Sequence, residues 1–293
     1  MPNPGTLVSI GLPVRNAGPR VADVARSVLA QDHANLELVI SDNASTDDTE
    51  AVCRELACSD DRIVYHRQAR NIGLMNNFQY VIRAATGTFF RWIGDDDRLE
   101  PDFATRCLDT FEADPRLVIV TTGISYTGPD GRAQSAAYAG TGLGSDDPVE
   151  RFAEMLRLLN ESHLLIDPLY AMMRRETVAA IPRRNMLHED EIFAGKLALA
   201  GPWGHVHDVL AYRHWTDDSV TKLGKLLNVP AWQWRMRNAL QYRETATVVR
   251  EAGLTPDQRR RALAAARDWY LTRQWRLIRR RGIKLVRMAT PAR

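Results

Sequence analysis

The sequence of 293 residues is poor in cysteine and contains no long apolar run. Its three cysteines are odd in number and lack the spacing of a zinc site, which argues against a disulfide framework and favours a reducing compartment. No stretch approaches the roughly 18 apolar residues of a membrane-spanning helix, and the N-terminus has no signal-peptide core. We therefore expect a cytoplasmic globular protein, either free or at the inner face of the membrane.

Three familiar sequence motifs are also absent. No Gly-x-Gly-x-x-Gly pattern follows the first apolar run, where residues 11–16 read GLPVRN, and this disfavours a dinucleotide-binding fold. The chain has no Gly-Lys-Ser/Thr phosphate loop. His188 and Glu189 begin like a zinc-protease helix, but Ile192 stands where the second histidine would be.

Charge is distributed unevenly along the chain. The composition, with 45% hydrophobic and 26% charged residues and a net charge of +3, is that of an ordinary globular protein. Residues 256–293 nevertheless contain 12 Lys and Arg against 2 acidic residues, a local net charge of +10. The preceding 255 residues carry 27 basic and 34 acidic side chains, a net charge of −7. We expect the basic tail and the acidic body to have different roles.

Short apolar runs alternate with helical patterns over the first 125 residues. The apolar runs, which are typical of strands, lie at 7–12, 36–41, 63–66, 88–93 and 117–122. The helical patterns lie near 20–31, 47–58, 73–85 and 101–113. This alternation predicts an α/β fold with a doubly wound, mostly parallel sheet, whose ligands bind beyond the carboxyl ends of the strands.

The rest of the chain predicts the completion of this sheet and a helical extension. The turn sequence GPDG at 128–131 indicates a hairpin, with a mobile loop after it up to residue 148. We expect helices at 148–160 and 187–200, a strand at 204–212, and helix from 226 to the end. The prediction is thus a main domain at residues 1–225 and a helical, basic C-terminal extension at residues 226–293.

Three consecutive aspartates, Asp95, Asp96 and Asp97, follow the apolar run at 88–93 after a single glycine, Gly94. A buried strand that ends in acids delivers carboxylates to the edge of a sheet, where such close like charges repel one another without a compensating cation. Mg²⁺ and Mn²⁺ prefer carboxylate oxygens and commonly share them with substrate phosphates. The run is a candidate metal site, and the alternative is a solvated acidic turn that caps the helix near Pro101.

Five short motifs, in order, resemble glycosyltransferase family 2, the inverting nucleotide-sugar transferases of GT-A fold. The matching segments are 8–16 (VSIGLPVRN), 37–49 (ELVISDNASTDDT), 70–73 (RNIG), 95–97 with Pro101, and 188–190 (HED). Together they cover residues 7 to about 215. The resemblance implies that residues 1–225 form a GT-A-type catalytic domain that binds a nucleotide-sugar donor.

The resemblance also implies roles for the residues on the donor side. Asp42 would accept the ring N–H of the nucleotide base, in a pocket that Pro13 and Asn16 line. Arg70 would meet the pyrophosphate, for which its guanidinium fork is suited, and Asp95 would face the ribose. The residues alone leave open that Asp42 is a turn or cap residue and that Arg70 is a surface arginine.

A metal ion, Mn²⁺ or Mg²⁺, is implied by the same resemblance. Asp96 would hold it, with Asp97 nearby, and it would stabilise the charge on the departing nucleoside diphosphate. Family members often have another Asp at the position of Gly94, so which two of the three acids act stays open. His214 lies where relatives often have a His after a Tyr-Arg pair, and it is either a metal or phosphate ligand or a structural histidine.

Inversion at the sugar carbon needs a base on the face opposite the leaving group. In family members this base is the Asp of a Glu-Asp pair, which corresponds to Asp190. We expect Glu189 and Glu191 to raise its pKa through like-charge repulsion. The alternative from the residues alone is a solvated acidic helix start.

The basic tail interleaves arginines with Trp269, Tyr270 and Trp275. Basic amphipathic helices with aromatic residues suit anionic membrane surfaces. Residues 256–293 are therefore expected either to associate peripherally with a membrane, beside a lipid-linked acceptor, or to pack as a C-terminal helix pair. No nucleic-acid partner is expected, because no recognition module is apparent.

The sequence thus predicts a metal-dependent inverting glycosyltransferase that moves a single sugar from a nucleotide-sugar donor to an acceptor hydroxyl. UDP-sugars are favoured over dTDP- and GDP-sugars, and the acceptor is expected to be a cell-envelope glycan, a glycolipid or a secondary metabolite. The chain lacks the Gln-x-x-Arg-Trp signature of processive relatives. The alternatives are a nucleotide-sugar-binding protein without catalysis and a sugar nucleotidyltransferase, whose Gly-rich, Arg-containing loop is missing after the first strand.

Overall fold

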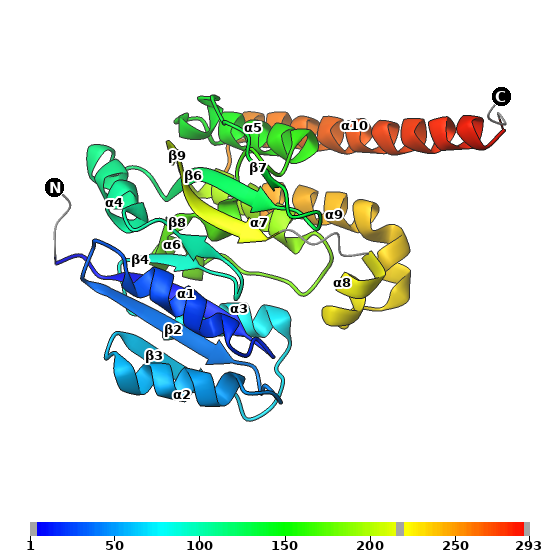
Figure 1. The fold of residues 1–293 in the computed structure, drawn as a ribbon. Helices are drawn as coiled ribbons and strands as arrows, with labels where there is room; N and C mark the ends of the chain where they lie inside the picture. Colours follow the sequence, from blue (N-terminus) through cyan, green and yellow to red (C-terminus); the bar gives the residue numbers. More distant parts are fainter. Residues whose placement is uncertain (1–4, 215–219, 290–293) are drawn as a thin grey trace.

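A curled sheet, nine-stranded over the described residues, forms the centre of the fold (Figure 1). The computed structural model of the chain describes residues 5–214 and 220–289. Along the sheet the strand order is β3-β2-β1-β4-β8-β6-β9-β5, and β7 pairs with β6 off this path. Helices and strands alternate through the first half of the chain, so the predicted α/β class with a mostly parallel sheet is confirmed.

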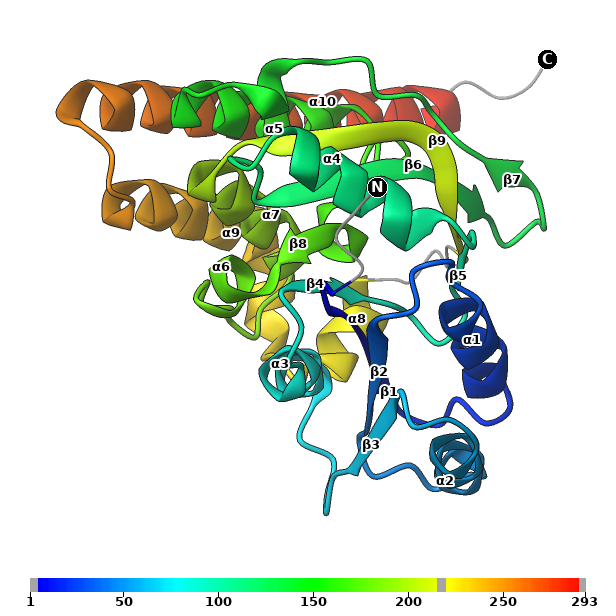
Figure 2. The same cartoon turned by 90° about the vertical axis from the view of Figure 1, so that its left-hand side faces the viewer.

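The first four strands are parallel neighbours joined by helices. The strands are β1 (Val8–Val14), β2 (Leu36–Asp42), β3 (Ile63–Arg67) and β4 (Phe89–Trp92), and the helices are α1 (Arg20–Leu29), α2 (Thr49–Ser59) and α3 (Leu74–Ala84). Helices α1 and α2 cover one face of these strands and α3 covers the other (Figure 2). This is the predicted doubly wound arrangement, and each predicted boundary lies within two residues of the observed one.

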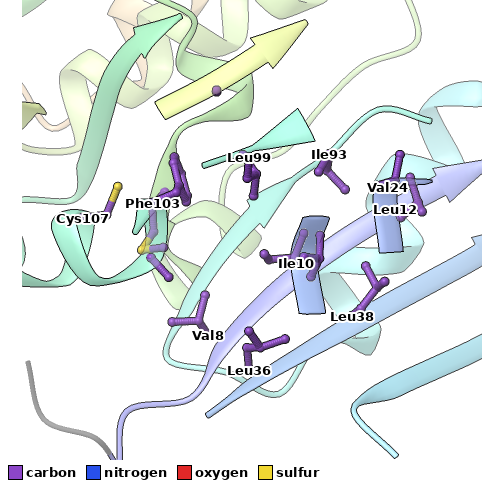
Figure 3. Packing of buried hydrophobic residues seen from close by; sticks show 14 of the residues in the cluster. Val8, Ile10, Leu12, Val24, Leu36, Leu38, Ile93, Leu99, Phe103 and Cys107 are labelled. Atoms are coloured by element: carbon purple, nitrogen blue, oxygen red, sulfur yellow. The ribbon is translucent and has the colours of Figure 1, made fainter. Parts of the chain in front are cut away.

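Alternate residues of β1 build the core beneath α1 (Figure 3). Val8, Ile10 and Leu12 are completely buried in one cluster with residues of α1 and β2. Gly11 has the opposite orientation, and a Cβ there would lie 2.9 Å from Cγ2 of Val81 on α3. Such a contact is too short for a real Cβ, so glycine at this position lets α3 lie close to the sheet.

The second half of the sheet includes two short strands that the sequence analysis did not predict. Strands β6 (Ile119–Thr127) and β9 (Trp203–His214) are parallel neighbours and extend the predicted strands at 117–122 and 204–212. Strand β8 (Met172–Arg174) lies antiparallel between β4 and β6, and β5 (Arg98–Leu99) pairs antiparallel with β9. A strand of two or three residues is too short to show the alternation of apolar and polar residues from which strands are predicted. Strand β7 (Ala133–Gln134) pairs with the end of β6 and forms the predicted hairpin.

The C-terminal helices pack on other helices of the fold. The helices after β4 are α4 (Phe103–Ala113), α5 (Pro148–Glu161), α6 (Arg175–Ala179), α7 (Glu189–Ala200), α8 (Val220–Leu226), α9 (Ala231–Glu251) and α10 (Pro256–Ala289), with 3-10 helices at Gly142–Gly144 and Pro168–Tyr170. Helices α9 and α10 bury Val249 and Trp269 against Phe152 of α5. The predicted helical C-terminus is confirmed up to Ala289, and its last residues, 290–293, lie outside the described residues. The predicted domain division after residue 225 falls at the end of α8 and stays a prediction.

Within residues 5–214 and 220–289, no helix combines the length and the apolar character that crossing a bilayer requires.

Candidate active site

The predicted site residues follow strands that end at one edge of the sheet. Asp42 ends β2, the aspartate run Asp95–Asp97 follows β4, and His214 ends β9. Strand β5 pairs with β9, with Arg98 opposite Tyr212, so the aspartate run is held beside the last residues of β9. Strand β5, which has only two residues, therefore helps to position the site.

Asp97 is buried, and other groups of the chain bind its carboxylate. Its carboxylate accepts a 2.8 Å hydrogen bond from the N–H of Gly94 and lies 3.2 Å from Nε of Arg213. Arg213 also forms an ion pair with Asp167, and its Cζ lies 3.5 Å from the centroid of the Tyr170 ring. Asp97 thus anchors Arg213, and its predicted place beside a metal stays a prediction.

Asp96 differs from its neighbours because its side chain is exposed and forms no ion pair with the described residues. Desolvation by the surrounding protein, together with the negative charges of Asp97 and Asp95, raises the pKa of Asp96. Nδ1 of His214 lies 2.9 Å from the main-chain oxygen of Asp96, so the other ring nitrogen of His214 is directed away from this contact. The structure therefore brings together a carboxylate and an imidazole that both retain ligand atoms.

Asp95 is bound by Arg20, the first residue of α1. Nη2 of Arg20 lies 2.5 Å from Oδ2 of Asp95, and this hydrogen bond raises the pKa of the arginine. The Arg20 side chain is 56% exposed. The pair links the aspartate run to the loop after β1, on the side where the donor is expected.

Asp42 is completely buried and its carboxylate has three donors within the protein. Oδ1 accepts a 2.8 Å hydrogen bond from the N–H of Ser45, while Oδ2 accepts bonds from the Tyr65 hydroxyl, at 3.1 Å, and from Arg67. Burial, followed by the charge of Asp42, raises the pKa of Tyr65 to about 12, so this hydroxyl remains a donor at neutral pH. A nucleotide base can reach this carboxylate only if Arg67 shifts or shares it.

Pro13, Asn16 and Arg70 surround this end of the sheet in different ways. Pro13 is half-buried on β1, opposite Ser41 of β2. Asn16 has a φ of 55°, and its Oδ1 accepts a 2.9 Å hydrogen bond from the N–H of Thr46, which ties the loop after β1 to the loop after β2. Arg70 is exposed and makes no ion pair with the described residues. Their predicted donor contacts stay predictions.

A pocket of about 840 Å³, here called the Arg15 pocket, opens beside these loops. Asn43 and Asn71 line it and are joined by a 2.9 Å hydrogen bond between their side chains. Lys222 and Lys225 of α8 line it from another side. The sequence analysis did not identify Arg15 or the two lysines, although Arg15 lies inside the matched motif at 8–16.

A second pocket, of about 400 Å³, contains the predicted base Asp190 and is here called the Asp190 pocket. Arg213, Asp167 and Tyr170 line it, together with Tyr126, Met155, Leu158, Leu159, Ser162, His163, Ile166, Pro168, Leu169, Glu191 and Ala194. Because Arg213 also binds Asp97, it connects this pocket with the aspartate run. Sequence reasoning missed Arg213, although it directly precedes the singled-out His214.

The two acids that flank Asp190 at the start of α7 are each bound by an arginine. Glu189 is buried in an ion pair with Arg183. Glu191 binds Arg273 of α10, with Nη2 2.9 Å from Oε1. Helix α10 therefore contacts the start of α7 directly, a contact that nothing in the local sequence indicated.

These contacts give Asp190 and Glu191 opposite pKa shifts. Desolvation by the surrounding protein, and then the negative charge of Glu191, raises the pKa of Asp190, and the charge of His188 opposes this. Burial also acts to raise the pKa of Glu191, but hydrogen bonds from His188 and Arg273 outweigh it and hold that pKa at about 2. The predicted rise in the pKa of Asp190 is confirmed in direction, but desolvation is its first cause, and of the two flanking acids Glu191 and not Glu189 is among the causes. Glu191 stays ionised while Asp190 is the better proton acceptor.

Sequence comparison identifies related proteins. A family model described as glycosyl transferase family 2 matches residues 9–181. Chondroitin synthase of Escherichia coli is 34% identical over 116 residues, which are 40% of this chain and 17% of that protein. The putative teichuronic acid biosynthesis glycosyltransferase TuaG of Bacillus subtilis is 29% identical over 131 residues, which are 45% of this chain and 52% of that protein. The matched segment thus spans about half or less of these relatives.

Solved structures share the fold at low sequence identity. S. aureus TarS 1–349 in complex with UDP-GlcNAc has a TM-score of 0.64 at 15% identity, covering 90% of this chain and 72% of that one. The mannosyltransferase PcManGT from Pyrobaculum calidifontis, in complex with GDP-Man and Mn²⁺, has a TM-score of 0.58 at 17% identity, covering 100% of this chain and 79% of that one. At such identities the likeness establishes the fold.

Proposed function

The chain belongs to glycosyltransferase family 2, and we propose that it is a metal-dependent, inverting glycosyltransferase that moves one sugar from a nucleotide-sugar donor to an acceptor hydroxyl. The observation that carries this proposal is the placement of two carboxylates, Asp96 and Asp190, that form no ion pair within residues 5–214 and 220–289. Arg213 connects their surroundings, because it binds Asp97 and lines the Asp190 pocket. A transfer between two substrates needs such a pair of sites, one for the departing diphosphate and one for the attacking hydroxyl.

Asp190 is the proposed base. It accepts the proton of the acceptor hydroxyl while that oxygen attacks the anomeric carbon of the donor. The bond from this carbon to the diphosphate oxygen breaks at the same time, and its electron pair leaves with the diphosphate. Attack from the opposite face inverts the configuration. The Asp190 pocket, about 400 Å³, is within the size range of small-molecule sites and supplies aromatic walls for a sugar acceptor.

Asp96 and His214 are the proposed protein ligands of Mn²⁺ or Mg²⁺. The described residues contain no group of three or more His, Cys, Asp or Glu that could hold a metal by themselves. A carboxylate and an imidazole nevertheless suit Mn²⁺, and such ions commonly complete their coordination with substrate phosphates and water. When bound, the ion supplies positive charge against the departing diphosphate. Asp97 supports this site indirectly, because its ion pair holds Arg213 in position.

The donor is proposed to be a UDP-sugar, with dTDP- and GDP-sugars as the next choices. Asp42 would accept the ring N–H that uracil, thymine and guanine present, once Arg67 shares or releases its Oδ2. Two structures with this fold were solved with UDP-GlcNAc and GDP-Man, whose bases both carry such an N–H. Pro13, Asn16 and Arg70 complete the donor site in this proposal, and Asp95 faces the ribose beside Arg20.

The acceptor is proposed to be a glycan, a lipid-linked sugar or a small molecule of cell-envelope synthesis. This agrees with the names of the matched relatives, a chondroitin synthase and a teichuronic acid glycosyltransferase. We assign catalysis to residues 1–225, in the cytoplasm or at the inner membrane face, and a separate role to residues 226–293. The competing candidates are a nucleotide-sugar-binding protein without catalysis and a sugar nucleotidyltransferase.

A thermal-shift screen with Mn²⁺ and a panel of nucleoside diphosphates tests the donor assignment. A ligand at a hundred times its Kd adds about 2.7 kcal/mol to the free energy of unfolding, and at equal concentration the tightest ligand adds most. If the donor is a UDP-sugar, UDP should therefore raise Tm most. Release of UDP from a UDP-sugar would then distinguish an enzyme from a binding protein. Tighter binding of ADP or CDP than of UDP, dTDP and GDP would overturn the role of Asp42.

A further inference from the structure

The large hydrophobic side chains that are exposed in the described part of the chain all lie on the last three helices. They are Leu226 at 56%, Trp232 at 57%, Met236 at 51%, Leu271 at 55%, Trp275 at 66% and Ile278 at 62% exposed. Residues 5–214, which form the whole sheet, expose none of this kind. The exposure is therefore a property of one region rather than of the surface in general.

Helix α10 has two opposite apolar faces. One face, through Ala262 and Ala266, is completely buried against the rest of the protein. The other, here called the Trp275 stripe, consists of Leu271, Trp275 and Ile278 at the spacing i, i+4, i+7, and each is more than half exposed. A helix that packs only on its own protein carries polar residues on its outer face. The Trp275 stripe therefore indicates a partner outside the described fold.

The charge of this region identifies the chemistry of that partner. Residues 220–293 contain 18 Lys and Arg against 4 Asp and Glu, a net charge of +14, whereas residues 1–219 contain 21 and 32, a net charge of −11. Arg279 is exposed beside the Trp275 stripe, four residues after Trp275, whereas Arg276 donates a hydrogen bond to the main-chain oxygen of Asn160 on α5. Two copies of such a surface would repel each other, and a fully aqueous polyanion would not require the apolar stripe. An anionic lipid bilayer satisfies both the charge and the apolar side chains.

The position of these helices is compatible with docking. Helix α10 projects beyond the sheet, and α8 lies on the side to which β2 and β6 point (Figure 1). Leu226 of α8 is exposed and also lines the Arg15 pocket. A bilayer that contacts α8 and α10 would therefore lie near the proposed donor site.

We propose that α8, α9 and α10 form a docking surface for an anionic lipid bilayer. The Trp275 stripe enters the boundary between headgroups and acyl chains, and the neighbouring arginines bind lipid phosphates. This surface uses no residue of the aspartate run and does not depend on the proposed transfer reaction. Binding and catalysis can therefore be tested separately.

Flotation of the full chain with vesicles tests the proposal. We expect binding to vesicles of phosphatidylglycerol mixed with phosphatidylcholine, weak binding to phosphatidylcholine alone, and weaker binding at high salt. Changing Leu271, Trp275 and Ile278 together to Ser should reduce binding by about tenfold for each side chain that is inserted. Trp275→Phe, which keeps an aromatic ring, should retain most of it.

A matched pair of single variants tests the charge. Arg279→Gln on α10 should weaken binding about fivefold, and Arg83→Gln on α3, also exposed, should leave it unchanged. Absence of vesicle binding, or equal binding by the triple Ser variant, would overturn the proposal. Self-association that the triple Ser variant abolishes, without vesicle binding, would assign the stripe to a second copy instead. Binding of a single-stranded oligonucleotide without vesicle binding would assign the surface to nucleic acid.

Discussion

The aspartate run and the start of α7 are two acidic triplets with the same arrangement. In each triplet, arginines bind the two outer acids and no described arginine or lysine pairs with the middle one. The pairs are Asp95 with Arg20, Asp97 with Arg213, Glu189 with Arg183 and Glu191 with Arg273. The middle acids are Asp96 and Asp190, and desolvation raises the pKa of both. This arrangement leaves one carboxylate of each triplet available for chemistry.

The triplets differ in where their arginines come from. Arg20 and Arg213 belong to α1 and β9, whereas Arg273 belongs to α10. The side chains of Arg20 and Asp95 are 56% and 31% exposed, but those of Arg273 and Glu191 are only 22% and 16% exposed. The proposed base therefore depends on the C-terminal helix, and the proposed metal ligand does not.

The largest effect is expected at Asp96. Asp96→Asn removes the charge that would hold the metal, and metal stabilisation of a leaving group contributes several kcal/mol, so transfer should fall about a thousandfold or more. Asp109→Asn, an exposed aspartate on α4, is the matched control and should keep the parent rate. EDTA should reproduce the loss in the parent protein. Full activity in excess EDTA would eliminate the metal-dependent mechanism.

Asp190→Asn should have the next largest effect. The substitution is nearly isosteric and removes the proton acceptor, and general-base catalysis contributes about 10²–10⁴-fold. Because the pKa of Asp190 is raised, activity of the parent should fall as pH decreases and the carboxylate takes up a proton. Calorimetry should find unchanged donor binding. A parent-like rate in this variant would contradict the assignment, since Glu189 and Glu191 are both held by arginines.

The parts of the fold that sequence predicted are those with a local signal. Strands β1 to β4 were predicted because their apolar runs are bounded by turn residues. Strands β8 and β5 have three and two residues. Strand β8 forms between the longer strands β4 and β6, and β5 forms on the free edge of β9. Their existence depends on tertiary structure, which no short window of sequence contains.

The same division applies to the candidate site. Asp96 and Asp190 were predicted because they lie in short motifs, but the ion pairs that set their surroundings join residues far apart in the chain. Asp97 binds a residue 116 positions away, and Glu191 binds one 82 positions away. Arg67 on Asp42 was missed for the same reason, although only 25 positions separate them. Motifs therefore indicated the proposed reactive groups but not the residues that position them.

A smaller effect, expected at Arg273, distinguishes the two triplets most directly. Arg273→Gln removes positive charge near Glu191 and Asp190, so the pKa of both carboxylates should rise. A higher pKa at Asp190 moves the acid limb of the rate profile to higher pH, and at a fixed pH below that limb a rise of one in this pKa lowers the rate about tenfold. Glu191 has its pKa lowered to about 2, so its contribution to stability is present above its unfolded pKa of about 4.3 and is lost as pH falls towards 2. The variant should therefore be less stable than the parent at neutral pH, and this difference should shrink below about pH 4.

Arg20→Gln is the matched change in the other triplet. Its ion pair with Asp95 is largely exposed, and such pairs contribute about 0–1 kcal/mol, so the rate should change by no more than about fivefold. The acid limb should stay where it is, because the acids that act on the charge of Arg20 are Asp95, Asp96 and Asp47, whereas Asp190 acts on the charge of Arg273. An equal displacement of the acid limb in both variants, or none in Arg273→Gln, would mean that α10 does not set the protonation of Asp190. Helix α10 would then stabilise the start of α7 only through packing contacts. The two triplets would then differ only in how exposed their ion pairs are.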